Sequence, residues 1–232
     1  MGKPELVIAA NPDSMAKQAA ERTARVITES VQARGQCTLA LAGGGTPKGV
    51  YALLAQMKTL PWDKVVFYYG DERCVAPDDK DSNHRMAHES LLGPLGIADA
   101  QIRRMEGEDA DREQAAARYA ASLPERFDLI LLGMGPDGHT ASLFPGHEAM
   151  GERQRLVMPV KGPKPPPWRL TLTAPVIEAA REVFVLAHGQ GKAQKIAEVM
   201  GEPIDIAVRP IQLAHAGVWF LDEASASLLP VQ

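Results

Sequence analysis

Short hydrophobic runs alternate with longer amphipathic segments along this chain. Runs of four or five apolar residues predict strands over 6–10, 38–42, 65–69, 128–132, 169–173, 183–187 and 218–221. Apolar residues at helical spacing predict helices over 12–34, 46–57, 83–92 and 110–123. Parallel strands need such crossover helices. The alternation therefore predicts an α/β fold, with a mainly parallel sheet covered by helices on both faces.

Capping residues support these boundaries. Asn11-Pro12 is typical of a helix start and Gly35 of a helix end, and Thr46-Pro47 predicts the start of the second helix. The proline-rich stretch at 163–167 predicts a stiff surface loop rather than a domain boundary. Because no internal repeat interrupts the pattern, we expect one domain over residues 1–232.

Composition and charge narrow the possible partners. Hydrophobic residues make up 45% and charged residues 23%, which is ordinary for a globular protein. The formal net charge is −4 without a long basic run, so we expect no nucleic-acid partner. The two cysteines form no CxxC pair, and the N-terminal apolar run is too short for a signal peptide or a membrane span. These features predict a cytoplasmic protein with no membrane partner.

The first candidate site is the glycine-rich stretch AGGGTPKGVY at 42–51. A Walker A loop is excluded because Lys48 precedes Gly49 and no Ser or Thr follows; a dinucleotide fingerprint is excluded because its third glycine would stand at position 48. A strand followed by Gly43, Gly44, Gly45 and a helix start still exposes backbone N–H groups that suit a phosphate monoester. A tight turn is the alternative, but three glycines favour close approach by an anion.

The second candidate is GDER, which follows the strand at 65–69. Ligands bind at the carboxyl ends of strands in open α/β sheets, so Asp71 and Arg73 are candidate ligand contacts. A plain surface ion pair is the alternative. His84 and His88 have the spacing of metal ligands on a helix, but no third ligand is evident and we expect no metal site.

The third candidate is LLGMGPDGHTASLFPG at 131–146, where His139 is surrounded by glycines and prolines. A neutral imidazole is suited to take a proton from water near neutral pH. Ser142 could be imagined as a nucleophile, but no G-x-S-x-G sequence surrounds it, so we expect a cap or turn residue.

In the order AGGGTPKGVY, FYYGDERCVAPDDKDSN, LLGMGPDGHTASLFPG and PPPWRLTLT, these motifs resemble the 6-phosphogluconolactonase family. The resemblance extends from Leu6 to the final VWFLDEASASLL. It implies hydrolysis of 6-phosphoglucono-1,5-lactone to 6-phosphogluconate, the second step of the oxidative pentose phosphate pathway, with no metal or organic cofactor. It also implies a Rossmann-like fold that resembles glucosamine-6-phosphate deaminase. The expected partner is a small sugar-phosphate lactone, and the expected assembly is a monomer or weak homodimer.

Position by position, the resemblance places the catalytic histidine at His139, with the acidic candidates Asp137 and Asp71 beside it. It assigns phosphate binding to the following residues: Gly43, Gly44, Gly45, Thr46, Arg73, Arg169 and Lys192. We expect His139 to activate the water and then protonate the leaving ring oxygen, while Asp137 or another nearby carboxylate holds the imidazole tautomer. Two donors for the oxyanion stay open: Arg73, or backbone N–H groups near Gly138.

Two other functions fit parts of the sequence. Sugar-phosphate deaminases and isomerases share a DGH-type segment, but theirs resembles GHIAFNEPG, with a glutamate. Here the segment is GHTASLFPG, and Phe144 precedes Pro145. A non-catalytic sugar-phosphate sensor would need a DNA-binding appendage, for which the chain has no spare segment. Both alternatives are therefore less favoured than a lactonase.

Overall fold

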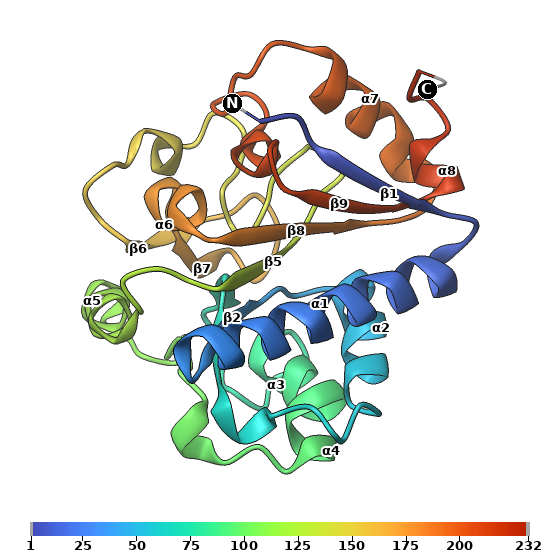
Figure 1. Ribbon diagram of the computed structural model, residues 1–232. Coiled ribbons are helices and arrows are strands. Elements are labelled where there is room, and N and C mark those ends of the chain that lie inside the picture. The colour runs from blue at the N-terminus through green and yellow to red at the C-terminus, as the bar shows by residue number, and fades with distance from the viewer. Residues whose placement is uncertain (1, 231–232) are drawn as a thin grey trace.

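The computed structural model describes residues 2–230 and is built around one parallel sheet (Figure 1). The strands follow in the order β1 (Glu5–Ala9), β9 (Val218–Asp222), β8 (Glu182–Ala187), β5 (Leu129–Gly133), β2 (Cys37–Leu41) and β3 (Val65–Tyr69). Every neighbouring pair is parallel. The predicted α/β architecture is confirmed.

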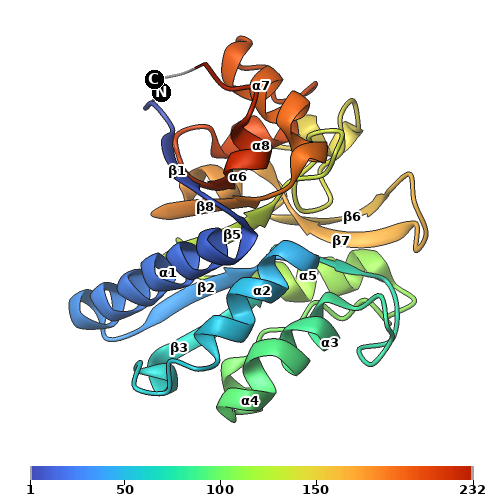
Figure 2. The same ribbon diagram turned by 90° about the vertical axis from the view of Figure 1, so that its right-hand side faces the viewer.

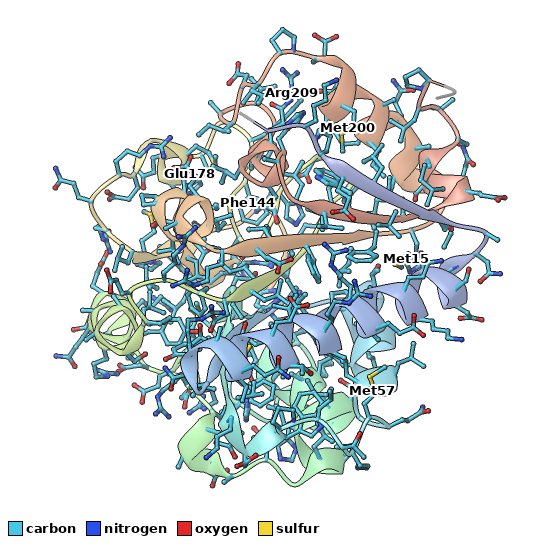
Figure 3. The ribbon with its side chains drawn as sticks, viewed as in Figure 1. Met15, Met57, Phe144, Glu178, Met200 and Arg209 are labelled. Atoms are coloured by element: carbon cyan, nitrogen blue, oxygen red, sulfur yellow. The ribbon has the colours of Figure 1, made fainter. Side chains whose placement is uncertain are left out.

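Helices cover both faces of this sheet. On one face lie α1 (Pro12–Arg34), α2 (Gly45–Leu54) and α3 (Asn83–Ala87); on the other lie α5 (Arg112–Ser122), α6 (Ala174–Ala179) and α7 (Ala193–Gly201). Alternate residues of β5 face the two layers: Leu131 packs with α1 and α2, and Ile130 with α5 and α6. Figure 3 shows the same division, with Met15 and Phe144 on opposite sides of the sheet. Both layers pack on one sheet, and a single domain over residues 1–232 stays a prediction.

Helix boundaries agree with the capping signals at α1 but not at α2. The Asn11 side chain accepts from the Ser14 N–H in a capping box, and Gly35 ends α1 with φ 76°. At α2 the prediction is wrong by two residues, since Gly44 and not Thr46 is the N-cap. Gly44 has φ 100°, a conformation that favours glycine, so the chain enters the helix earlier than Thr46-Pro47 suggests.

The segment predicted as one helix over 83–92 is more irregular. After α3 the chain forms a π-helical turn (His88–Leu92) and then α4 (Gly93–Leu95). A short α8 (Glu223–Ala226) follows β9. No helix within residues 2–230 combines the length and the apolar character that crossing a membrane requires.

A second, antiparallel sheet lies beside the main one and contains β4 (Asp71–Arg73), β7 (Trp168–Leu172) and β6 (Val157–Lys161) (Figure 2). Of these strands only β7 is predicted by the sequence. The residues Asp-Glu-Arg of β4 have little intrinsic preference for a strand, so pairing with β7 imposes their conformation. The predicted proline-rich loop joins β6 to β7, where the Gly162 N–H donates to Pro167 O at 2.7 Å.

Two buried tyrosines fix the ends of β2 and β3. Tyr51 Oη accepts from the Ala42 N–H at 2.8 Å and donates to Ala42 O at 2.9 Å. Tyr119 Oη makes the same pair of bonds to Tyr69, at 2.7 Å and 3.0 Å. Burial raises the pKa of both hydroxyls, so they remain neutral and can donate and accept at once. The residues that directly follow Ala42 and Tyr69 in the chain enter the candidate site.

Candidate active site

The candidate site lies where the chain order of the strands reverses. From β2 the chain continues to the edge strand β3, and from β5 it continues to β8 on the other side. Ligands of open α/β sheets bind at the carboxyl ends of strands at such a point. A cavity of about 250 Å³ is found there. Its walls include nine of the ten predicted residues: Gly43, Gly44, Gly45, Thr46, Asp71, Arg73, His139, Arg169 and Lys192.

Asp137 is the predicted residue outside the cavity wall, and it contacts His139 directly. Its Oδ1 lies 2.5 Å from His139 Nδ1 and accepts from the His139 backbone N–H at 3.2 Å. A carboxylate only accepts, so Nδ1 carries the hydrogen and Nε2 is the free acceptor of the neutral ring. Partial burial raises the pKa of Asp137, but the hydrogen bond and charge of His139 outweigh it and hold that pKa below its usual value.

Gly135 explains part of the glycine content around His139. A Cβ at this position would lie 2.1 Å from both Nδ1 and Cε1 of His139 and 2.7 Å from Asp137 Oδ1. Any side chain here would therefore displace the imidazole or separate it from the carboxylate. Gly138 has φ 85° in the turn between the two residues, and its N–H donates to Gly135 O at 3.1 Å. Gly135 thus leaves room for the imidazole, and Gly138 allows the turn that brings His139 and Asp137 together.

Phe144 lies close to two residues of the site, His139 and Arg169. Its ring centroid lies 4.8 Å from that of His139 and 5.8 Å from the guanidinium carbon of Arg169. The side chain is buried, and its ring also reaches the backbone of Gly162 on the β6–β7 connection. An apolar ring therefore lies beside the imidazole. In the deaminase-type segment GHIAFNEPG, a glutamate occupies the position of Phe144.

Three cations line the cavity without a carboxylate partner within residues 2–230. Lys192 Nζ donates to Met134 O at 2.7 Å, and Arg73 Nη1 donates to Asp81 O at 2.5 Å. The Nε atoms of Arg73 and Arg169 are buried and have no hydrogen-bond partner in this part of the chain. Burial lowers the pKa of Arg169 and of Lys192. An anion would supply the missing counter-charge.

The N-terminus of α2 adds backbone donors to the same cavity. The first intrahelical bond runs from the Lys48 N–H to Gly44 O at 3.2 Å, so the N–H groups of Gly45 and Thr46 precede it. The N-cap residue is Gly44, and within residues 2–230 it gives this end no side-chain cap. Free N–H groups and the helix dipole both favour a negatively charged group here.

Asp71 lines the cavity but is bound to other residues than His139. Its Oδ2 accepts from Ser142 Oγ at 2.6 Å, and its Oδ1 accepts from Asn83 Nδ2 at 3.1 Å. Ser142 is fully buried, which agrees with the expectation that it is not a nucleophile. Asp71 thus joins the His139 loop to β4 and α3.

Two polar residues of the site, Glu72 and Asn83, were not predicted. Glu72 is buried and accepts from the backbone N–H groups of Arg73, Asn83 and His84 at 2.7–2.8 Å, as well as from Ser82 Oγ at 3.0 Å. Burial raises its pKa, although these bonds oppose the shift. The GDER motif marks Glu72 as a strand-end residue, but only its tertiary contacts reveal that it caps α3.

The His84–His88 pair lies away from this cavity. The ring centroids are 6.0 Å apart, and His84 Nδ1 lies 2.8 Å from Tyr69 Oη. Among the described residues, no group of three or more His, Cys, Asp or Glu side chains is placed to hold a metal ion.

Known proteins resemble this chain over almost all of its length. A sequence model of the family described as glucosamine-6-phosphate isomerases/6-phosphogluconolactonase matches residues 10–220. A 6-phosphogluconolactonase of Streptomyces coelicolor is 37% identical, and the alignment covers 98% of this chain and 95% of the relative. The structure of a 6-phosphogluconolactonase from Trypanosoma cruzi superposes with a TM-score of 0.87 at 29% identity, covering 100% of this chain and 99% of that one.

The fold is shared more widely than the sequence. A monomeric glucosamine-6-phosphate deaminase superposes with a TM-score of 0.84 but at only 22% identity, covering 97% of this chain and 99% of that chain. This likeness concerns the arrangement of the elements alone. The predicted similarity to the deaminase fold is confirmed.

Proposed function

The chain belongs to the glucosamine-6-phosphate isomerase/6-phosphogluconolactonase family, and we propose that it hydrolyses 6-phosphoglucono-1,5-lactone to 6-phosphogluconate. This reaction is the second step of the oxidative pentose phosphate pathway. The observation that carries the proposal is the pairing of His139 with Asp137 at one wall of a cavity whose cations have no carboxylate partner among the described residues. The curated 6-phosphogluconolactonases at 35–38% identity give it further support.

The chemistry begins with a water molecule at the lactone carbonyl. His139 Nε2 takes a proton from this water as it attacks, because Nδ1 is already committed to Asp137. The negative charge of Asp137 stabilises the imidazolium that forms. When the tetrahedral intermediate collapses, the imidazolium gives its proton to the ring oxygen, which leaves as a hydroxyl. The product acid then ionises and releases one proton.

The oxyanion needs a donor at the carbonyl. The N–H of Gly138 is used in a turn with Gly135, so Arg73 is the better of the two predicted candidates. Its guanidinium lines the cavity together with His139, and we assign oxyanion stabilisation to it.

We assign the phosphate of the substrate to the donors of the cavity that are not used at the carbonyl. The N–H groups of Gly45 and Thr46, with Arg169 and Lys192, provide donors and charge for it. This group is remote from the carbonyl, so its binding energy orients the ring toward His139. Asp71 holds the loops together through Ser142 and Asn83 and is assigned a positioning role.

Acid release tests the proposal directly. At mildly acidic pH, where spontaneous opening is slow, the wild-type protein should accelerate proton release from the phosphorylated lactone well above the uncatalysed rate. Arg169→Gln should reduce kcat/KM for this lactone by about tenfold or more, and much less for unphosphorylated glucono-1,5-lactone. Arg153→Gln removes an exposed arginine on the surface and serves as the matched control.

Two outcomes would contradict these expectations. No acceleration of lactone opening, together with ammonia release from glucosamine-6-phosphate, would place the chain with the deaminases. Equal losses on both lactones would remove Arg169 from the phosphate site.

A further inference from the structure

Asn83 is a buried polar residue of the cavity that has no part in the reaction described above. It is the first residue of α3, and its backbone N–H donates to Glu72 Oε1 at 2.7 Å. Because Glu72 also binds the Ser82 hydroxyl and the His84 N–H, the start of α3 is fixed on β4. The Asn83 side chain therefore has a well-defined position on the cavity wall.

The orientation of the Asn83 amide is determined by its partners. Nδ2 donates to Asp71 O at 2.9 Å and to Asp71 Oδ1 at 3.1 Å. Both partner atoms can only accept, so the amide cannot be reversed without placing oxygen against oxygen. Oδ1 must point the other way, toward Gly43, where a Cβ would lie 2.0 Å from it. The absence of a side chain at Gly43 leaves the room that Oδ1 occupies.

Oδ1 of Asn83 differs chemically from the cationic side chains and backbone donors of the cavity wall. Within residues 2–230 it accepts no hydrogen bond, although Nδ2 of the same amide donates to two acceptors. Arg73, Arg169, Lys192 and the start of α2 all donate, which suits phosphate and oxyanion oxygens. A neutral acceptor among these donors requires a ligand group with a hydrogen of its own. In a sugar lactone, that group is a ring hydroxyl.

We propose that Asn83 Oδ1 accepts a hydrogen bond from a ring hydroxyl of the lactone, so that Asn83 determines specificity for hydroxylated substrates. The inference rests on the proposed lactonase function and adds a second recognition point to it. The cationic and backbone donors of the cavity bind the phosphate and the developing oxyanion. Asn83 instead recognises a hydroxyl of the sugar ring. A lactone without the matching hydroxyl would leave Oδ1 unpaired in the occupied cavity.

Deoxy substrates test this assignment. The probes are 6-phosphoglucono-1,5-lactones lacking the hydroxyl at C2, C3 or C4, compared with the parent lactone by acid release. We expect the wild-type protein to lose about tenfold or more in kcat/KM on one of them. Asn83→Ala should lose a similar factor on the parent lactone and should no longer discriminate against that analogue. A residue that only supports the fold would lower both rates and leave the discrimination unchanged.

Ser142→Ala is the matched control, because it removes the other side-chain bond of Asp71 and leaves Oδ1 in place. It should keep the wild-type discrimination. The proposal is overturned if the wild type treats all three analogues within about twofold of the parent, or if Asn83→Ala discriminates as the wild type does. Wild-type failure on the parent lactone would refute the lactonase function instead.

A crystal structure of the wild type with 6-phosphogluconate covers the case in which Asn83→Ala does not fold. We expect a sugar hydroxyl within ordinary hydrogen-bond distance of Oδ1, about 2.5–3.0 Å. A product bound with every hydroxyl beyond about 3.5 Å overturns the proposal.

Discussion

His139 and His84 both place Nδ1 in a short hydrogen bond, but the two partners differ in charge. His139 faces the ionised carboxylate of Asp137, whereas His84 faces the hydroxyl of Tyr69, whose pKa burial raises further. For His84, burial is the main cause of a pKa lowered to about 4, with help from the nearby charges of Arg104 and His88. We infer that a carboxylate partner and access to the cavity would make His139, and not His84, a useful base.

His139→Ala has the largest expected effect and tests the first half of this comparison. Loss of the general base should reduce kcat/KM by about 10²–10⁴-fold, with acid release from the phosphorylated lactone as the measurement. His84→Gln is the control and should retain near wild-type activity. A His139→Ala protein with near wild-type rates would show that the base is another group.

Gly135→Ala disturbs the geometry of the His139–Asp137 pair without removing either side chain. The new Cβ would meet the imidazole at 2.1 Å, so the ring must move away from Asp137. We expect kcat to fall by about 10- to 100-fold, because small displacements of catalytic groups have effects of this size. Gly133→Ala is the matched control, since its Cβ would meet only Gly43 O at 3.8 Å, and it should lose much less. Equal losses in the two variants would contradict a specific role for Gly135.

Asp137→Asn makes the partner of His139 neutral, like that of His84. We expect kcat to fall by about tenfold or more, with little change in KM, because a neutral amide stabilises the imidazolium less than a carboxylate does. The lowered pKa of Asp137 keeps it ionised in the wild type from pH 5 to 8. A pH series of kcat should therefore show the difference between wild type and variant over that whole range. A difference that vanished at pH 5 would contradict the assignment of Asp137 as the ionised partner of His139.

His84→Gln has the smallest expected effect, and it concerns stability rather than activity. The folded-state pKa of His84 lies near 4, below the unfolded value near 6.5, so the unfolded chain binds its proton first as the pH falls. This residue therefore costs stability increasingly from about pH 6.5 down to about pH 4. Between pH 7.5 and pH 5, the thermal unfolding temperature should drop less for the His84→Gln variant than for the wild type. Identical drops would mean that His84 titrates normally.

The sequence predicts the frame of the molecule and the positions of its site loops. Parallel strands end at one edge of a sheet, so motifs that follow β2, β3 and β5 must meet there, and the cavity brings Arg73 and His139 together as expected. Strand β4 and the cap formed by Glu72 were missed. Their geometry depends on pairing with β7 and on contacts with α3, which local spacing does not encode.

The two aspartates show the same limit within the site. Both match acidic family positions, and the sequence offers no means of telling their partners apart. Asp137 is two residues from His139, and a local turn is sufficient to join them. Asp71 contacts Ser142, which is 71 residues away, and this pairing exists only in the folded chain. The catalytic roles of Asp137 and His139 remain predictions that the variants above test, and the catalytic role predicted for Asp71 stays a prediction beside the positioning role assigned to it.

The hydroxyls of Tyr51 and Tyr119 have a consequence for local opening. Each binds both backbone groups of the last residue before a site loop, Ala42 or Tyr69, from the hydrophobic core. The amide protons of those two residues should exchange with deuterated solvent only when the core opens. The amides of Gly45 and Thr46, a few positions later, should exchange quickly and become protected when a sugar phosphate binds. The boundary between permanent protection and ligand-dependent protection would then fall within a few peptide bonds.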